Sequence, residues 1–499
     1  MTDIPAETHE AIGRPADRRR ITTNFLAMFA TSALGLVVGL VISIYIRRTL
    51  GPAAIGQVSW SMAVLGYLII LTNPGLTTVG QRELSRDPTR GQELLALLLT
   101  LQSILAVVVY AMVVAFAALE VRGETVSLLL VIQGLTLLLS AWNTAWVIQA
   151  NERMVAPSIA NLVLNVLQVP VLFLVVRGPA DVYLYAACTL LLPLCGLLFN
   201  LWYIGRHKFV SPGSLRPTLG GACRLLRDAW PLALAQGAVL IYYNCDTIIL
   251  GFTDGDAAVG QYATAYKLML VSSFITAALW NAYFPALARA HAQPAHATAL
   301  AREYLGLLAW TGMPIAALGW ACGRHLVNLM FGPAFAPSGP YFEWLCLNIA
   351  IMFVNYAIVS ILVPWGYSKL QFKIAAAAAI SNLLLNLLVI PLYGPWAAVA
   401  TTLAAELVVL VSGIWVRRRL GIVSHPIVPI IAPPLLCSAL VALVIVALPR
   451  SFDHLWWLKV LGGAAVLGAC FLFFKRRFQR LDAGEVGTGS LPAPGTSGP

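Results

Sequence analysis

Long apolar runs follow one another along almost the whole chain, with short polar loops between them. A run of about 20 apolar residues is long enough to cross the hydrocarbon core of a bilayer as a helix. The pattern therefore predicts an all-α polytopic membrane protein with about 14 transmembrane helices. The predicted spans are 24–46, 55–79, 93–118, 125–149, 157–176, 181–204, 231–251, 258–284, 302–321, 341–364, 371–393, 395–415, 426–448 and 456–474.

Polar and basic stretches divide this array into two six-helix lobes and a C-terminal helix pair. The ends of the chain are polar and poor in large apolar residues, which is typical of disorder. The predicted segments are a cytoplasmic N-terminal tail at 1–23, an N-lobe at 24–204, a cytoplasmic linker at 205–229, a C-lobe at 230–415, helices 13 and 14 within 416–474 and a disordered cytoplasmic tail at 475–499.

A repeated motif relates the two lobes. The stretch GPAAIGQ at 51–57 returns as GDAAVGQ at 255–261, an offset of 204 residues. Two asparagines four residues apart and a later proline also recur, at 161–170 and at 382–391. Matched helices are six apart, and an even number preserves direction across the membrane. The lobes are therefore predicted to be parallel repeats, an architecture in which transporters bind substrate between the halves near the midplane.

Composition and charge support a membrane protein. The chain is 59% hydrophobic and 11% charged, whereas soluble domains run near 25% charged. The net charge of +11 comes from basic residues in short loops, so it does not indicate nucleic-acid binding. With the N-terminus inside, 24 basic residues fall on the inner side and seven on the outer, and Lys267 alone lies within the membrane. This asymmetry predicts that both termini are cytoplasmic.

The sequence predicts neither a cofactor nor a metal site. None of the eight cysteines forms a CxxC pair, and most lie in apolar runs. The chain has no GxxxxGK[ST] phosphate loop, and its outer loops are too short for a catalytic domain. A transporter is therefore expected rather than an enzyme.

Asp246 and Lys267 are the first candidate functional residues, because ionisable groups in the membrane are costly and rarely lack a use. At 1.5 Å per residue they lie about 9 Å and about 14 Å below the outer ends of their helices. The functional interpretation is a cationic cavity with an acidic partner. The alternative is a static ion pair that holds two helices together. The matching residues of the first copy are Ile42 and Ala63, so this charge is not repeated.

Glu406 and the paired asparagines are the next candidates. Glu406 lies in the twelfth predicted helix, either as a protonatable coupling site or bonded to neighbouring hydroxyls. Asp246 is a second candidate for ion coupling. Asn161 and Asn382, each with a partner at i+4, could contact substrate or form interhelical hydrogen bonds, and hydrogen bonding is the favoured role.

Three arginines complete the candidate set. Arg47 and Arg48 fall at the outer end of the first predicted helix, where snorkelling to the interface is the favoured interpretation over substrate binding. Arg82 follows the second helix on the inner side. It could meet a lipid headgroup there or simply set the topology.

These motifs together resemble a known family. Ile46–Pro52 followed by Gly56 is similar to the R-x-LG opening of oligosaccharide flippases, and NPGL at 73–76 and RELS at 82–85 continue the pattern. The entry WPL at 230–232, with Asp246, GQY at 260–262 and Lys267, resembles the start of the second lobe, and FGPAF at 331–335 is also similar. The resemblance spans about 24–415 and indicates the Wzx-type polysaccharide transport branch of the multidrug/oligosaccharidyl-lipid/polysaccharide exporter superfamily.

The resemblance implies a flippase of the bacterial inner membrane that serves O-antigen or exopolysaccharide synthesis. Its expected substrate is an undecaprenyl-pyrophosphate-linked oligosaccharide, and its expected partners are membrane lipids and the polysaccharide polymerase and chain-length machinery. The substrate's charge must be shielded from hydrocarbon, which a partly cationic cavity achieves. A multidrug cation/proton antiporter is the alternative transporter, although Lys267 argues against it. A membrane glycosyltransferase or polymerase is the enzyme alternative.

Overall fold

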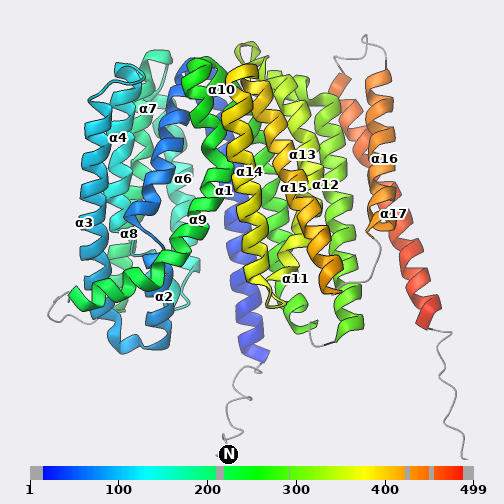
Figure 1. Ribbon diagram of the computed structural model, residues 1–499, viewed down its shortest axis with the longest axis horizontal. Helices are drawn as coiled ribbons and strands as arrows, with labels where there is room; N and C mark the ends of the chain where they lie inside the picture. The colour runs from blue at the N-terminus through cyan, green and yellow to red at the C-terminus, as the bar shows by residue number, and fades with distance from the viewer. Residues whose placement is uncertain (1–14, 210–218, 291–292, 422–426, 449–454, 487–499) are drawn as a thin grey trace, which may run out of the picture. The chain divides into compact units, whose positions relative to one another are not determined.

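The structure is a computed structural model that describes residues 15–209, 219–290, 293–421, 427–448 and 455–486. Within these ranges helices are the only regular secondary structure, which confirms the all-α prediction (Figure 1). The α-helices are α1 (Pro15–Thr72), α2 (Leu76–Arg86), α3 (Gly91–Ala117), α4 (Glu124–Ala141), α5 (Ala145–Ala150), α6 (Val155–Val175), α7 (Val182–Thr189), α8 (Leu191–His207), α9 (Leu219–Thr253), α10 (Gly255–Val271), α11 (Ser273–Ala290), α12 (Pro294–Phe331), α13 (Ser338–Val359), α14 (Ser368–Tyr393), α15 (Pro395–Leu420), α16 (Val428–Ala447) and α17 (Trp456–Val486).

Enough of these helices can cross a membrane to match the predicted number. In the described ranges twelve segments are long and apolar enough, and α9 adds a thirteenth when its two parts, bent by 42°, are taken together. One of the twelve, Ala30–Thr72, contains two predicted spans on either side of a break at Gly51. The count therefore agrees with about 14 spans.

Gly51 and Gly255 show how the repeated motif makes the same turn twice. Their φ angles are 79° and 81°, a region that suits glycine and strains other residues. Pro52, just after the first glycine, has a φ that suits the first turn of a helix. Each copy of the motif therefore ends one helix and begins the next.

Several helix ends differ from the sequence prediction. The second span was predicted to end at residue 79, but α1 stops at Thr72 and α2 begins at Leu76. Pro74 lacks a backbone donor and Gly75 has a φ of 82°, so the helix cannot continue through them. Helix α9 already begins at Leu219, inside the predicted linker. The terminal tails also contain helix, from Pro15 and up to Val486, while the tail predictions for 1–14 and 487–499 lie outside the described residues.

The chain forms two compact units. Unit 1 comprises residues 1–267, 328–338 and 372–405, and unit 2 comprises 268–327, 339–371 and 406–499. Unit 1 thus joins the first half of the chain to the whole of α9 and to parts of α10, α12, α14 and α15. The division into six-helix lobes stays a prediction.

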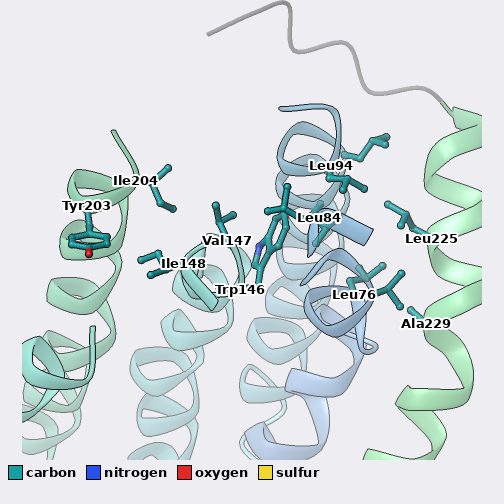
Figure 2. Packing of buried hydrophobic residues seen from close by; sticks show 13 residues of the cluster. Leu76, Leu84, Leu94, Trp146, Val147, Ile148, Tyr203, Ile204, Leu225 and Ala229 are labelled. Carbon is teal, nitrogen blue, oxygen red and sulfur yellow. The ribbon is translucent and has the colours of Figure 1, made fainter. Parts of the chain in front are cut away.

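A buried apolar cluster in unit 1 fixes the first part of α9 against the first half of the chain. Figure 2 shows Leu225 and Ala229 of α9 turned toward Leu76 of α2 and Leu94 of α3. Trp146 of α5 lies in the same cluster and is almost fully buried. Burial of such side chains, at roughly 1.5–3 kcal/mol each, explains why α9 starts before the predicted span.

Unit 2 packs through small residues that let helices approach closely. A Cβ on Gly312 of α12 would lie 2.4 Å from the ring of Phe353 in α13, and one on Gly319 would lie 2.5 Å from Cys346. A Cβ on Gly463 of α17 would similarly lie 2.8 Å from the side chain of Leu318. Without hydrophobic driving force between helices in lipid, such close van der Waals contact is a main source of association.

Candidate functional site

Arg47 is turned into the protein and is only 8% exposed. Its Nε donates to Thr264 Oγ1 at 2.9 Å, its Nη1 donates to the hydroxyl of Ser43, and its guanidinium lies 5.6 Å from the ring centre of Phe331. Snorkelling, the favoured sequence interpretation, is therefore wrong for Arg47. The Nη2 group has no hydrogen-bond partner among the described residues and remains available to a ligand.

Lys267 of α10 has an exposed side chain in unit 1. It lies near enough to Arg47 for the two positive charges to interact. None of the ion pairs between described residues includes Lys267. Two neighbouring cations that form no ion pair with a described carboxylate attract an anion, because an anion relieves their mutual repulsion.

Asp246 of α9 is almost completely buried, with 2% of its surface exposed. Its carboxylate accepts hydrogen bonds from the hydroxyl of Tyr262 and, at 2.7 Å, from the backbone N–H of Thr247. Thr402 of α15 continues the network, 3.3 Å from the Tyr262 hydroxyl. The structure therefore gives Asp246 neutral partners, and the static Asp246–Lys267 ion pair is not formed in the described part of the chain.

Asn382 and Asn386 join three helices of unit 1. Asn386 Nδ2 donates to Asn382 Oδ1 and to Cys245 Sγ, both at 3.0 Å, and the hydroxyl of Thr401 donates to Asn386. Cys245 lies on α9, the asparagines on α14 and Thr401 on α15. This arrangement agrees with the favoured interhelical role for Asn382.

Asn161 and Arg82 lie in different surroundings. The side chain of Asn161 on α6 is exposed, and its backbone carbonyl accepts from Asn165 at 2.8 Å within the same helix. The two copies of the asparagine pair are thus not equivalent. Arg82 of α2 has a side chain 49% exposed and lies 3.4 Å from Glu83 and 4.0 Å from Asp228.

Glu406 lies in unit 2 and is 7% exposed, and the side-chain amide of Asn355 is one of its partners. Asn355 Nδ2 donates both to the Glu406 carboxylate and, at 2.9 Å, to its backbone carbonyl. The pair ties α13 to α15.

Replacing Asn355 by alanine is expected to destabilise the protein by about 1–3 kcal/mol, because it removes a donor from a buried carboxylate. Thermal unfolding in detergent measures the loss. Replacing both Asn355 and Glu406 by leucine serves as the control and should recover part of the stability, since it removes the buried carboxylate together with its Asn355 donor. Equal stability of wild type and Asn355→Ala would contradict the assigned contact.

Sequence reasoning missed the residues that fix the charged groups. Tyr262 and Thr264 hold Asp246 and Arg47, and both follow directly on the repeated glycine motif. Their proximity to that motif was the available signal. Phe331 was visible only as part of the FGPAF motif, which did not indicate its approach to Arg47, because that approach depends on the packing of α12.

Solved structures show which fold this is. The inward closed conformation of the lipid II flippase MurJ matches with a TM-score of 0.73 and 12% identity over 92% of this chain and 99% of that chain. An inward-facing multidrug resistance MATE family transporter of the MOP superfamily matches with a TM-score of 0.59 and 13% identity over 78% of this chain and 94% of that one. The protein thus has the multi-pass helical fold of this superfamily.

A family model narrows the assignment. The model described as "Polysaccharide biosynthesis protein" matches residues 21–291, more than half of the chain, so the chain belongs to that family. Similar proteins include the "Putative O-antigen transporter" of Shigella dysenteriae, 22% identical over 78% of this chain and 97% of the relative. The protein of the same name from Escherichia coli (strain K12) is 20% identical over 73% and 89%.

Proposed function

We propose that the protein is a flippase that moves polyprenyl-pyrophosphate-linked oligosaccharide units across the bacterial inner membrane for synthesis of a surface polysaccharide such as O-antigen. The observation that carries this proposal is the exposed ammonium of Lys267 near the guanidinium of Arg47, which uses its Nε and Nη1 donors in hydrogen bonds within the protein. The family assignment and the O-antigen transporters among its relatives support it.

The two cations suit a pyrophosphate for different reasons. Arg47 is held by Thr264 and Ser43 and can offer its remaining donors in a fixed direction, whereas Lys267 acts as a mobile point charge. Together they can neutralise a pyrophosphate that would otherwise be very unfavourable in the membrane. The polyprenyl chain can stay in lipid, where it is soluble.

The remaining candidates have subsidiary roles in the proposal. Arg82, exposed near the inner end of α2, meets the headgroup as it enters, and Asn161 offers its exposed amide to sugar hydroxyls. Asn382 supports helix packing instead of substrate contact. Asp246 and Glu406 are the proposed ion-coupling positions, since a buried carboxylate can change protonation as its surroundings alternate. Alternating access by relative motion of the two repeats is part of the proposal.

The charge distribution favours this function over export of drug cations. Asp246 and Glu406 are buried and bonded to protein groups, whereas the exposed group is the cation Lys267. A cation exporter would need the opposite arrangement.

A deletion strain and a reconstituted protein test the function. Deletion is expected to leave the lipid-linked oligosaccharide on the cytoplasmic leaflet and to abolish the surface polysaccharide. In vesicles, the purified protein should expose the sugar to a lectin on the opposite leaflet. Normal polysaccharide export in a deletion strain without a paralogue would refute the function.

The proposed orientation, with both termini cytoplasmic, is tested by labelling intact cells with an impermeant thiol reagent. Thr253→Cys, exposed at the end of α9, should react from outside, and Arg418→Cys, exposed near the end of α15, should react only after permeabilisation. The opposite labelling pattern would reverse the topology that the basic loops predict.

A further inference from the structure

The two copies of the repeated motif meet each other inside unit 1. A Cβ placed on Gly56 would lie 1.7 Å from the backbone oxygen of Asp256, and one placed on Gly260 would lie 1.9 Å from the backbone oxygen of Pro52. Gly56 and Gly260 are equivalent across the repeat, and so are Pro52 and Asp256, each pair being 204 residues apart. The crossing is thus symmetric, and only a hydrogen side chain fits at either glycine.

An ion pair that the repeat does not duplicate lies beside this crossing. The guanidinium of Arg122, in the connection between α3 and α4, pairs with the carboxylate of Asp256, which also accepts from Gln57 Nε2 at 2.9 Å. The equivalent position in the first copy is Pro52, which cannot form such a pair. Gln261, the equivalent of Gln57, instead donates to the backbone carbonyl of Ala334 at 2.8 Å.

Aromatic and backbone contacts enclose Arg122. Its side chain is 8% exposed and lies 4.6 Å from the ring centre of Trp60, whose indole N–H donates to the Ile248 carbonyl at 3.1 Å. Gly251 makes room for both, since a Cβ there would lie 2.1 Å from Trp60 and 2.6 Å from Arg122. Burial lowers the pKa of Arg122 while Asp256 opposes the shift, and an arginine stays charged at physiological pH in either case.

Arg48 adds another contact between the two halves at the same end of the helices. Its Nε donates to the carbonyl of Met330, near the C-terminus of α12, at 2.8 Å. Together with Arg47–Thr264, these contacts join the part of α1 around its break at Gly51 to α9, α10 and α12, on the outer side under the proposed orientation. These contacts are polar, and most of them involve residues in or near the two copies of the repeated motif.

We infer that the crossing of Gly56 and Gly260, latched by the Arg122–Asp256 ion pair, is a seal that closes the outer side of the transporter and must separate in each transport cycle. This inference rests on the proposed flippase function, because a flippase must release its headgroup on the outer side. The contacts suit reversible closure. Close backbone contact gives a defined closed position, while one ion pair and a few hydrogen bonds can be exchanged for water when the helices part.

Glycine substitutions test the seal without reference to any substrate. Spin labels at Leu119→Cys and Thr253→Cys, both exposed, report the distance between the two halves when the exposed native thiol Cys223 is replaced by serine. Gly56→Ala and Gly260→Ala should each shift the distance distribution to longer values. Gly66→Ala is the matched control, because it lies in the same helix as Gly56 and nothing approaches its Cβ position within 4 Å. Arg122→Gln, a milder change, should give a smaller shift in the same direction.

A reversible cross-link tests whether the seal must open. Gln57→Cys combined with Asp256→Cys is joined by a short bifunctional methanethiosulfonate, and flipping of the lipid-linked oligosaccharide is measured before joining, after joining and after reduction. Relative to the same variant before joining, we expect at least a tenfold loss on joining and recovery on reduction, and the reagent should not change the flipping of either single-cysteine variant. Undiminished flipping by the cross-linked protein would overturn the inference.

The outcomes separate the seal from the proposed function. If wild-type protein does not flip the oligosaccharide, the flippase proposal fails, and the spin-label distances alone decide the seal. Unchanged distances in both glycine variants would then overturn it. Longer distances in these variants, with Gly66→Ala like wild type, would support it.

Discussion

Lys267→Ala is expected to reduce flipping of the lipid-linked oligosaccharide about 10- to 150-fold, the equivalent of losing one charge-assisted contact of about 1.5–3 kcal/mol. Its side chain is exposed and forms no ion pair with another described residue, so protein abundance should be unchanged. Flipping in vesicles, normalised to reconstituted protein, is the measurement. Lys267→Arg should retain much of the activity, because the charge matters more than its shape.

Two further variants separate substrate binding from a structural role of Lys267. If Lys267 served mainly to neutralise Asp246, then Asp246→Asn would restore the activity of Lys267→Ala. The structure predicts no such rescue, because Asp246 is bonded to Tyr262 and Thr247. Lys369→Ala removes another exposed lysine and should behave like wild type. Full flipping by Lys267→Ala would exclude the proposed site.

Arg47→Ala should have a comparable effect on flipping and, unlike Lys267→Ala, should also lower stability. It removes a cation near Lys267 and breaks the buried link between α1 and Thr264 of α10. Arg47→Lys should fall between wild type and Arg47→Ala, because an ammonium keeps the charge but not the forked geometry that holds Ser43 and Thr264 together.

Thermal stability and flipping of the Arg47 variants are measured side by side. Arg177→Ala is the matched control, because it removes an exposed arginine whose only side-chain hydrogen bond to a described residue goes to the nearby carbonyl of Leu174. A loss of stability in Arg47→Ala with flipping per folded protein intact would reduce Arg47 to a structural role. A loss of both in Arg177→Ala would show that removing another arginine gives the same result.

The sequence predicted the architecture because a membrane imposes a strong and local constraint. A helix that crosses hydrocarbon must satisfy its backbone internally and present about 20 apolar residues, so each span is visible without its neighbours. The repeated motif was visible for a similar reason. Gly51 and Gly255 must each make the same tight turn, and few residues other than glycine allow a φ near 80°.

The sequence could not decide what each charged residue contacts. Arg47 stands at the end of a predicted span, where snorkelling is the usual expectation. It is buried instead and donates a hydrogen bond to Thr264, more than 200 residues away in the sequence. Asp246 and Lys267 have similar predicted depths, but depth does not specify which face of a helix a side chain occupies. Tyr262, directly after the repeated motif, supplies the partner of Asp246 instead.

The sequence by itself determined the all-α membrane class, the number of spans, the repeat and the list of ionisable residues within the membrane. Each of these depends on local composition or on identity between two stretches. Only the tertiary structure decided that Gly56 meets Asp256 and that Gly260 meets Pro52. It also decided that Arg122 forms an ion pair with Asp256 beside this crossing. Such contacts depend on the relative rotation and distance of helices, which packing among many residues sets and no single stretch encodes.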